Sequence, residues 1–295
     1  MSDFRLKVFQ SVAKNLSFTK ASQELFVSQP AITKHIQELE ATYQTRLFDR
    51  QGSKISLTES GRLLLEHCER ILEDYKRLEY EMHLLHNEYI GELKLGASTT
   101  IAQYVLPPLL GSFIGKFPQV NLSLLNGNSR EIEAALQEHR IDLGLVEGVS
   151  RLPNLKYTTF LEDELVAVVH SKSRLQLPEE ITPQDLPAIP LVLRERGSGT
   201  LDVIERSLQK HGVKLASLHV LMYLGSTESI KLFLENSDCM GIVSIRSICK
   251  ELAAGTFRVV EIKDMPMLRD FCFVQLQGQE GGLSQAFMNY MFMSR

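Results

Sequence analysis

Three short stretches of the sequence combine hydroxyl side chains with glycines or arginines, a pattern that suits the binding of a small anion. Each stretch follows an apolar, strand-like run and precedes a helical run. Hydroxyls and unpaired N–H groups at a helix N-terminus attract negative charge. The residues predicted to bind the anion are Ser98, Thr99, Thr100, Arg194, Ser198, Thr200, Ser226 and Thr227. The alternative at each stretch is that serine and threonine only cap the following helix.

The sequence offers little for catalysis. None of the eight histidines lies in a recognisable motif with serine or cysteine, and there is no zinc-ligand spacing or dinucleotide fingerprint. The Gly-Ser-Gly-Thr turn that ends at Thr200 lacks the lysine of a phosphate-binding loop. We therefore expect no enzyme activity, no metal and no cofactor. Cys239, Cys249 and Cys272 leave a redox-sensing role open, although buried structural thiols are the simpler interpretation.

Composition indicates an ordinary globular protein with room for two or three domains, since 295 residues are 44% hydrophobic and 23% charged. No apolar run reaches the ~18 residues that a membrane span needs, and the N-terminus lacks a signal-peptide core, so we expect a cytoplasmic protein. The formal net charge is -4. Residues 1–62 carry nine basic and six acidic groups, which gives 9 − 6 = +3, so the rest carries −7. Because binding to phosphate depends on the local patch, the acidic total does not exclude nucleic acid as a partner.

The first part of the chain predicts three short helices, over residues 3–15, from Ser17 or Thr19 onward, and over about 29–42. Ser28 is a suitable N-cap for the third helix, and Pro30 follows in its first turn. The side chains at helical spacing predicted to point inward are Phe4, Val8, Phe9, Val12, Ala13, Ala21, Leu25, Phe26, Ala31, Ile32, Ile36 and Leu39.

The outer face of the third helix carries polar side chains that can contact DNA. Gln29, Thr33, Lys34 and Gln37 are suited to a helix in a major groove. Arg50, Gly52 and Lys54 then fall in a predicted hairpin turn, which could contact the DNA backbone or the minor groove. The alternative is that any small three-helix domain shows this spacing.

A long helix is predicted between Arg62 and Ile90, because neither proline nor glycine occurs there. Its apolar residues alternate steps of four and three, which is typical of a coiled-coil seam. The predicted seam residues are Leu64, Cys68, Ile71, Tyr75, Leu78, Met82 and Leu85. We expect them to pair two chains, although a helix packed on its own domain remains an alternative. Beyond Gly91, strand-like and helical runs alternate as two α/β units that meet near Glu162. Ligands commonly bind at the carboxyl ends of strands in such folds.

Two segments in the first part closely resemble a known family: SFTKASQELFVSQPAITKHIQELE and LFDRQGSKISLTESG. They are similar to the winged helix-turn-helix of LysR-type transcriptional regulators. The resemblance implies that Gln29, Pro30, Thr33 and Lys34 face DNA, with Lys54 as a weaker candidate. The full set of predicted DNA-binding residues is Ser28, Gln29, Pro30, Thr33, Lys34, Gln37, Arg50 and Lys54.

The C-terminal part resembles the effector-binding domain of the same family, which is similar to periplasmic binding proteins. The implied organisation is a winged helix-turn-helix domain (1–58), a linker helix for dimerisation (59–90) and an α/β effector-binding domain (91–295). The last has one subdomain formed by 91–161 and 268–295 and another by 162–267, with crossings near 161–164 and 264–268. GASTTIAQYVLPPLL, GNSREI and IDLGLVEG resemble the branch that includes regulators of sulfur assimilation and carbon fixation. Arg246 stands where the family usually has proline.

The resemblance implies a homo-oligomeric transcriptional regulator, a dimer or tetramer, that binds double-stranded DNA. We expect a small, anionic effector to control its DNA binding or bending. RNA polymerase is left open as a partner. Two alternatives remain at this stage: a redox-sensing regulator and a DNA-binding protein that responds to no ligand.

Overall fold

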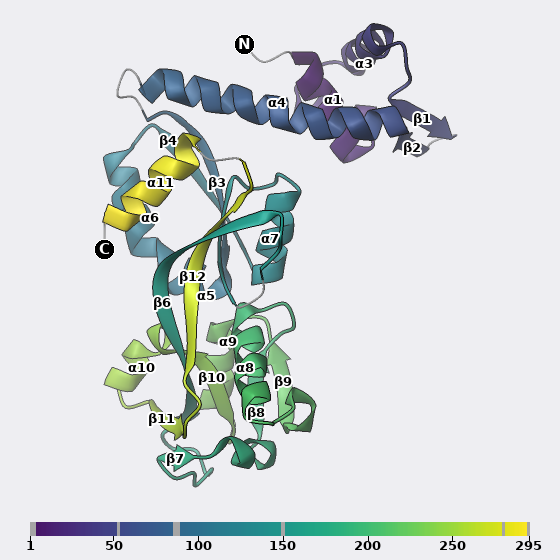
Figure 1. The fold of residues 1–295 in the computed structure, drawn as a ribbon. Coiled ribbons are helices and arrows are strands. Elements are labelled where there is room, and N and C mark those ends of the chain that lie inside the picture. The colour runs from purple at the N-terminus through teal and green to yellow at the C-terminus, as the bar shows by residue number, and fades with distance from the viewer. Residues whose placement is uncertain (1–3, 52–53, 85–88, 149–150, 279–280, 294–295) are drawn as a thin grey trace. The chain divides into compact units, whose positions relative to one another are not determined.

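The chain forms two compact units, Met1–Glu88 and Tyr89–Arg295, each with its own hydrophobic core. The computed structural model describes all residues except 1–3, 52–53, 85–88, 149–150, 279–280 and 294–295 (Figure 1). In the described parts of both units, no helix combines the length and the apolar character needed to cross a membrane.

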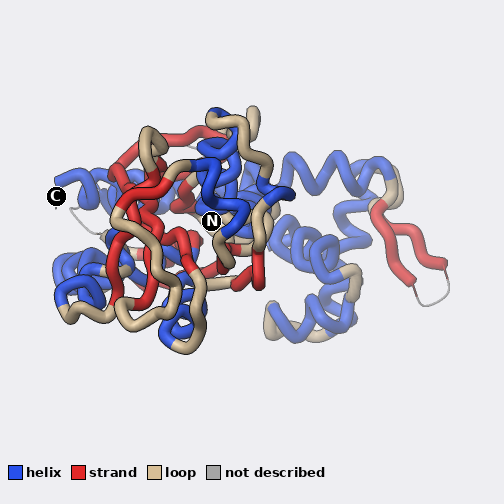
Figure 2. Tube along the Cα trace, turned by 90° about the horizontal axis from the view of Figure 1, so that it is seen from below, coloured by secondary structure: helices blue, strands red, loops and turns tan. Residues whose placement is uncertain are grey.

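The N-terminal unit is a small helical bundle with a hairpin and a long final helix. Its elements are α1 (Phe4–Asn15), α2 (Phe18–Glu24), α3 (Gln29–Tyr43), β1 (Phe48–Gln51), β2 (Lys54–Leu57) and α4 (Glu59–Leu84). Strands β1 and β2 pair antiparallel, and the hairpin extends beyond the helices (Figure 2). The predicted helix-turn-helix and wing are therefore both present.

Local hydrogen bonds fix where the two central helices begin. The Ser17 hydroxyl accepts a hydrogen bond from the Lys20 N–H at 3.2 Å, and the Ser28 hydroxyl accepts one from the Ala31 N–H at 3.4 Å. Pro30 lies in the first turn of α3, where a helix has no use for its missing N–H. Both caps were predictable because serine at an N-cap satisfies an otherwise unpaired donor.

The predicted inward direction of two aromatic residues is wrong. Phe26 is 95% exposed and has a φ of 55°, in the turn after α2 ends at Glu24. Because this backbone conformation reverses the chain direction, helical spacing no longer describes where the side chain points. Phe4, the first residue of α1, is 40% exposed and contacts the His35 ring edge-on, with centroids 5.5 Å apart.

The first half of the apolar stripe on α4 packs against its own unit. Cys68 is fully buried in the core of the three short helices, and Leu64 packs partly buried against the same core. Cys68 therefore packs within its own chain and not in a seam with a second chain, whereas the pairing of Leu64 stays a prediction. The Cys68 thiol donates a hydrogen bond to the Leu6 carbonyl at 3.3 Å. Burial, reinforced by the charge of Glu69, raises the pKa of Cys68 to about 12, which disfavours the reactive thiolate.

The second half of the stripe is exposed in the single chain. Ile71, Leu78 and Met82 are 40%, 53% and 54% exposed, and Tyr75 lies between them, partly buried. Leu85 lies outside the described residues. Helix α4 ends at Leu84, so the predicted extension to residue 90 is wrong for Tyr89 and Ile90, which are not helical.

The C-terminal unit is a mixed α/β fold built on one large sheet. Its strands are β3 (Gly91–Ser98), β4 (Val120–Gly127), β5 (Leu143–Glu147), β6 (Leu155–His170), β7 (Glu180–Ile181), β8 (Leu191–Arg194), β9 (Val220–Leu224), β10 (Met240–Ser244), β11 (Phe257–Ile262) and β12 (Met267–Leu276). Its helices are α5 (Thr99–Tyr104), α6 (Leu106–Lys116), α7 (Ser129–Gln137), α8 (Gly199–Lys210), α9 (Thr227–Glu235), α10 (Cys249–Ala253) and α11 (Gly282–Met293), with short 3₁₀ turns η1 (Pro183–Ala188), η2 (Leu215–Ser217) and η3 (Ile245–Ser247).

The strand order β4-β3-β5-β12-β6-β10-β8-β9 divides the unit into two lobes. Lobe I contains β3, β4 and β5 with α5, α6, α7 and α11. Lobe II contains β7 to β11 with α8, α9 and α10. The parallel pairs β3–β4, β3–β5 and β8–β9 place the carboxyl ends of these strands at the facing edges of the lobes, where helices begin.

Two long antiparallel strands, β6 and β12, run through both lobes side by side (Figure 1). Strand β12 pairs with β5 in lobe I from Phe271 onward, and β6 pairs with β10 in lobe II from Leu165 onward. Between these points, residues 162–164 and 268–270 pair only with each other among the described strands. This two-stranded segment is the crossover between the lobes. Residues 162–164 fall within the predicted crossing at 161–164, but 268–270 overlaps the predicted 264–268 only at Leu268. The sequence did not predict that each crossing is a continuous strand.

Candidate functional site

Helix α3 presents the predicted DNA-reading side chains on its outer face. Ser28, Gln29, Pro30, Lys34 and Gln37 are exposed. Thr33 is partly buried, and its hydroxyl donates a hydrogen bond to the carbonyl of Gln29 at 3.1 Å. The exposed side chains are free to meet a DNA groove.

The hairpin supplies the other predicted contacts. Arg50 lies in β1 opposite Ile55, and Lys54 lies in β2 opposite Gln51. Gly52, predicted in the turn, lies outside the described residues, as do the side-chain positions of Arg50 and Lys54. The backbone therefore places both residues near the tip of the hairpin.

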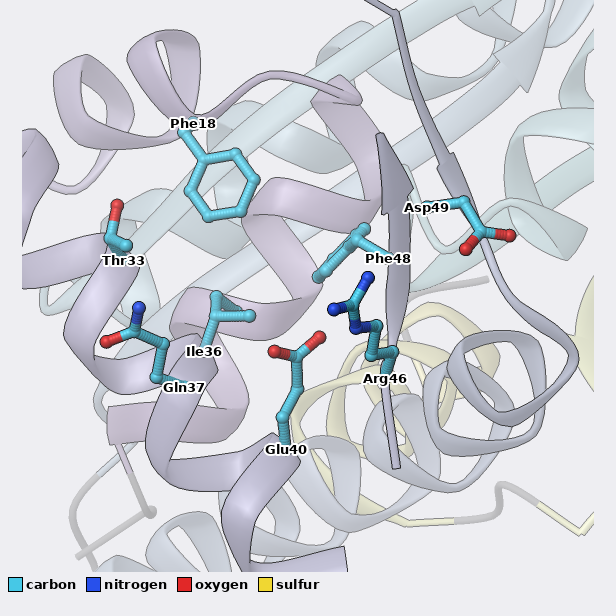
Figure 3. Close-up of a pocket in the computed structure, with 8 residues that line it drawn as sticks. All are labelled: Phe18, Thr33, Ile36, Gln37, Glu40, Arg46, Phe48 and Asp49. Carbon is cyan, nitrogen blue, oxygen red and sulfur yellow. The ribbon is translucent and has the colours of Figure 1, made fainter. Parts of the chain in front are cut away.

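A hollow of about 370 Å³ separates α3 from the base of this hairpin (Figure 3). Thr33 and Gln37 line it from α3, and Arg46 and Asp49 line it from the hairpin side. The Arg46 and Glu40 side chains point toward one another across it, and Glu40 Oε1 also accepts a hydrogen bond from the Leu47 N–H at 2.8 Å. Arg46 is an exposed cation next to the outer face of α3, and it was not among the predicted DNA-binding residues.

Arg194 contacts all three hydroxyl-rich loops of the C-terminal unit: its own and those at Thr99 and Gly225. It is 1% exposed, at the end of β8. Its Nη2 donates hydrogen bonds to the Thr99 hydroxyl in lobe I at 3.3 Å and to the Gly225 carbonyl at 3.3 Å. Its Nε is 2.8 Å from a carboxylate oxygen of the neighbouring Glu195. The three loops predicted from sequence therefore do meet at the lobe interface.

Two buried polar atoms at this interface have no hydrogen-bond partner within the described structure. They are Nη1 of Arg194 and the hydroxyl oxygen of Thr100, which is fully buried; Nη2 of Arg269 also lacks a hydrogen bond of good geometry but is ion-paired with Asp163 at 2.7 Å. An unpaired buried donor is unfavourable by about 1–3 kcal/mol, so such atoms indicate a place where a ligand group can bind.

Two of the predicted serines act as helix caps. The Ser198 hydroxyl accepts a hydrogen bond from the Thr200 N–H at 3.2 Å at the start of α8, and Ser226 accepts one from the Ser229 N–H at 3.1 Å at the start of α9. For these residues the capping alternative describes the observed contacts. Thr227, which follows in α9, is 2% exposed. Ser98 makes no such cap, and its hydroxyl instead donates to the carboxylate of Glu147.

Glu147 is a buried carboxylate that the sequence reading missed. It ends β5, next to Ser98 at the end of β3, because Ala97 pairs with Leu145 in the parallel ladder. Its side chain is 3% exposed. Its backbone carbonyl accepts a hydrogen bond from the Ser129 hydroxyl at 2.8 Å. Glu147 lies at the same carboxyl-end edge as the predicted hydroxyls.

Arg269, also missed, links both lobes at the crossover. Arg269 is the cross-strand partner of Asp163, and its Nη2 lies 2.7 Å from the Asp163 carboxylate. Its Nη1 donates to the Thr200 hydroxyl of lobe II at 2.9 Å and lies 3.6 Å from Glu147 Oε1 of lobe I. One guanidinium thus contacts the crossover and both lobes.

Arg246, which stands where the resembling family has proline, also contacts the crossover. Its Nη2 donates to the Glu162 carbonyl at 3.0 Å, and its Nε is 3.6 Å from the Asp163 carboxylate. The Ser244 hydroxyl donates to the same carboxylate at 2.7 Å. Arg246 therefore contacts the β6 strand of the crossover.

A second bridge joins the lobes through Tyr104 of α5, whose hydroxyl donates to Glu228 of α9. Lys231 Nζ donates a hydrogen bond to the same carboxylate at 2.9 Å. Burial, together with the hydrogen bond to Glu228, raises the pKa of Tyr104 above its ordinary value. Burial opposes ionisation of Glu228, but hydrogen bonds from Tyr104 and Lys231 outweigh it and lower its pKa.

The cysteines give no support to redox sensing. Cys239 and Cys272 are buried, and burial raises the pKa of Cys239 above the ordinary thiol value. Cys249 is exposed, and its thiol donates to the Ile245 carbonyl at 3.3 Å. Among the described residues all four cysteines are free thiols.

These features define a class of protein: a winged helix-turn-helix DNA reader joined to a two-lobed ligand-binding unit. Residues 4–62 match the family described as "Bacterial regulatory helix-turn-helix protein, lysR family", and residues 86–292 match "LysR substrate binding domain". The chain belongs to the LysR family of transcriptional regulators. It is a DNA-binding regulator with an effector-binding domain, not an enzyme.

Similar proteins span nearly the full chain. The HTH-type transcriptional regulator CysL of Bacillus subtilis is 29% identical over 269 residues, covering 91% of this chain and 89% of the relative. The RuBisCO operon transcriptional regulator of Acidithiobacillus ferrooxidans is 30% identical over 289 residues, covering 98% of this chain and 92% of the relative. The regulatory domain of Synechocystis PCC6803 CcmR, solved in complex with 2-PG, is 28% identical, with a TM-score of 0.62, and covers 69% of this chain and 97% of that one. The family expected from the sequence is thereby confirmed.

Proposed function

We propose that a small anionic effector binds between the two lobes and thereby changes how the protein binds or bends DNA. The observation that carries this proposal is the buried guanidinium of Arg194, which has an unpaired Nη1 and contacts loops from both lobes. The solved CcmR domain with its bound 2-PG supports a small molecule as the effector. A ligand shifts such a protein only by binding one lobe arrangement better than another, with a coupling of about 1–3 kcal/mol as the usual scale.

Replacing Thr100 by valine tests the effector site. The change keeps the shape of the side chain but removes a buried hydroxyl that has no partner within the described structure. We expect at least about fivefold weaker binding of an anionic effector by calorimetry on the full chain, because a hydrogen bond is lost. Ser112→Ala is the control, since this exposed hydroxyl donates to the Pro108 carbonyl of its own helix. Equal binding by the Thr100 variant and the wild type would contradict the site.

We further propose that Lys34 contacts a DNA phosphate, whereas Gln29 and Thr33 read base edges. Lys34→Ala should weaken binding to all duplexes alike and reduce the slope of log affinity against log salt by about 0.9. Gln29→Ala should instead lose about 1–3 kcal/mol of discrimination at one base pair. Fluorescence anisotropy with a footprinted operator and a scrambled duplex, at several salt concentrations, separates the two effects. Lys7→Ala, an exposed lysine of α1, should change neither.

We also propose that the exposed half of the α4 stripe pairs two chains. Ile71, Leu78 and Met82 recur at helical spacing and leave an apolar stripe open to solvent. The double variant Leu78→Glu, Met82→Glu should dissociate the oligomer or reduce its order, as measured by analytical ultracentrifugation of the full chain. Glu66→Ala, on another exposed face of the same helix, should sediment like the wild type. Unchanged sedimentation of the double variant would exclude this surface.

A further inference from the structure

The interlobe site, defined as Ser98–Thr100, Glu147, Arg194–Thr200 and Arg269, has balanced buried charges. Arg194 and Arg269 are the buried cations, and Glu147 and Asp163 are the buried anions around them, which gives 2 − 2 = 0. Around these groups, Glu195 adds one negative charge, and the exposed Arg196 and Arg246 add two positive charges. An anion that reaches the buried part of this site therefore meets no excess of positive charge, because the one extra positive charge lies on exposed arginines.

The carboxylate of Glu147 keeps unused capacity to accept hydrogen bonds. An ionised carboxylate offers about four lone-pair positions on its two oxygens. Ser98 donates to Oε2, and the Arg269 guanidinium lies 3.6 Å from Oε1, which is beyond hydrogen-bonding distance. In the contacts of the described residues, Oε1 of Glu147 thus accepts no side-chain hydrogen bond, and it is the oxygen that a ligand donor would bind.

The unpaired donors lie close by along the chain. Thr100 follows Ser98 by two residues, and Thr99 between them is bonded to Arg194. The unpaired Thr100 hydroxyl and Arg194 Nη1 suit a negatively charged group, whereas Glu147 suits a hydrogen-bond donor. A ligand in this small region would therefore need a hydrogen-bond acceptor for Arg194 and a hydrogen-bond donor for Glu147.

We propose that the effector is an anion that also carries a proton donor, and that Glu147 receives this donor and selects for it. The proposal rests on the proposed function, since it concerns the same site. Ligands of this chemistry are oxyanions that keep an O–H group, and carboxylates with a neighbouring hydroxyl or ammonium group. A fully deprotonated oxyanion is disfavoured, because its oxygens would face the carboxylate of Glu147 with no hydrogen between them.

Pairs of anions that differ in the proton donor test this inference on the full wild-type chain. Inorganic phosphate carries at least one O–H at pH 7, whereas sulfate, of similar size and shape, carries none. Lactate and propionate form a second pair, which distinguishes a hydroxy acid from a protonated oxyanion. Calorimetry at constant ionic strength should show at least about tenfold tighter binding of the donor-bearing anion in one pair or both.

The variant Glu147→Gln should abolish this selectivity. Its amide can donate a hydrogen bond to an anion, so sulfate should bind more tightly than to the wild type, and the preference within each pair should fall below about threefold. Glu138→Gln, an exposed carboxylate of lobe I, should keep the wild-type preference. If Glu147 served only to hold the lobes together, its replacement would change both members of a pair equally.

The outcomes separate the two proposals. Binding of the anions without preference in the wild-type chain would overturn the role of Glu147 and leave the anionic effector site standing. A failure of every anion to bind would overturn both. The wild-type comparison needs no variant, so it decides the question even if Glu147→Gln does not fold.

Discussion

Replacing Arg269 by methionine is expected to destabilise the C-terminal unit by about 3–5 kcal/mol. The guanidinium is the closest cation to Asp163, at 2.7 Å, and it also lies 3.6 Å from Glu147. Both carboxylates are almost fully buried, so the variant leaves buried negative charge poorly compensated. Differential scanning calorimetry of the full chain should show a fall of roughly 6–20 °C in the melting temperature of this unit, at about 2–4 °C per kcal/mol.

Arg140→Met is the matched control. Arg140 also pairs with a carboxylate, at 2.7 Å from Glu138, but the two side chains are 52% and 60% exposed. Water already solvates both charges, so the change should stay within about 0.5 kcal/mol. If the two variants melt alike, the crossover network does not stabilise the fold in the way that its burial indicates.

The variant Gly199→Ala is expected to hold the two lobes apart. A Cβ atom at Gly199, the first residue of α8 in lobe II, would lie 1.9 Å from the backbone carbonyl oxygen of Glu147 in lobe I. Backbone atoms cannot rotate away, so the lobes must separate locally. Overpacking of this kind is unfavourable by about 1–3 kcal/mol, which corresponds to roughly 5- to 150-fold weaker binding of an effector that requires the closed arrangement.

Small-angle X-ray scattering and calorimetry of the full chain would measure both consequences. Gly115→Ala in α6 is the control, because a Cβ there meets no atom within 4 Å. It should bind effector and scatter like the wild type. An unchanged scattering profile and affinity for Gly199→Ala would show that the contact between Gly199 and Glu147 relaxes without moving the lobes.

The sequence predicted those parts of the protein that short-range chemistry determines. Ser28 and Pro30 mark the start of the reading helix, and the loops at Thr99, Arg194 and Gly225 follow from hydroxyls and glycines between a strand and a helix. The prediction failed where distant chain segments decide the outcome. Heptad spacing could not show that Cys68 faces its own core, because the partner surface lies on other helices.

The missed charged residues have a related cause. Glu147 and Arg269 lie in strands that the apolar pattern marks as buried, and their partners are over 30 residues away in the sequence. A charge inside a buried strand is itself a signal, since such a group needs a partner. IDLGLVEG and FLEDELVAVV both contain charged residues within an apolar, strand-like run. The sequence alone does not indicate which cation pairs with which carboxylate.

The crossover of β6 and β12 determines what kind of lobe motion is available. Residues 162–164 and 268–270 are held by a backbone ladder, with the Arg269–Asp163 pair across it. A ribbon of two strands resists stretching but tolerates changes in twist. The lobes should therefore rotate relative to each other by twisting the ribbon, without pulling its strands apart. The backbone amides of the ribbon should stay protected from hydrogen exchange throughout this motion.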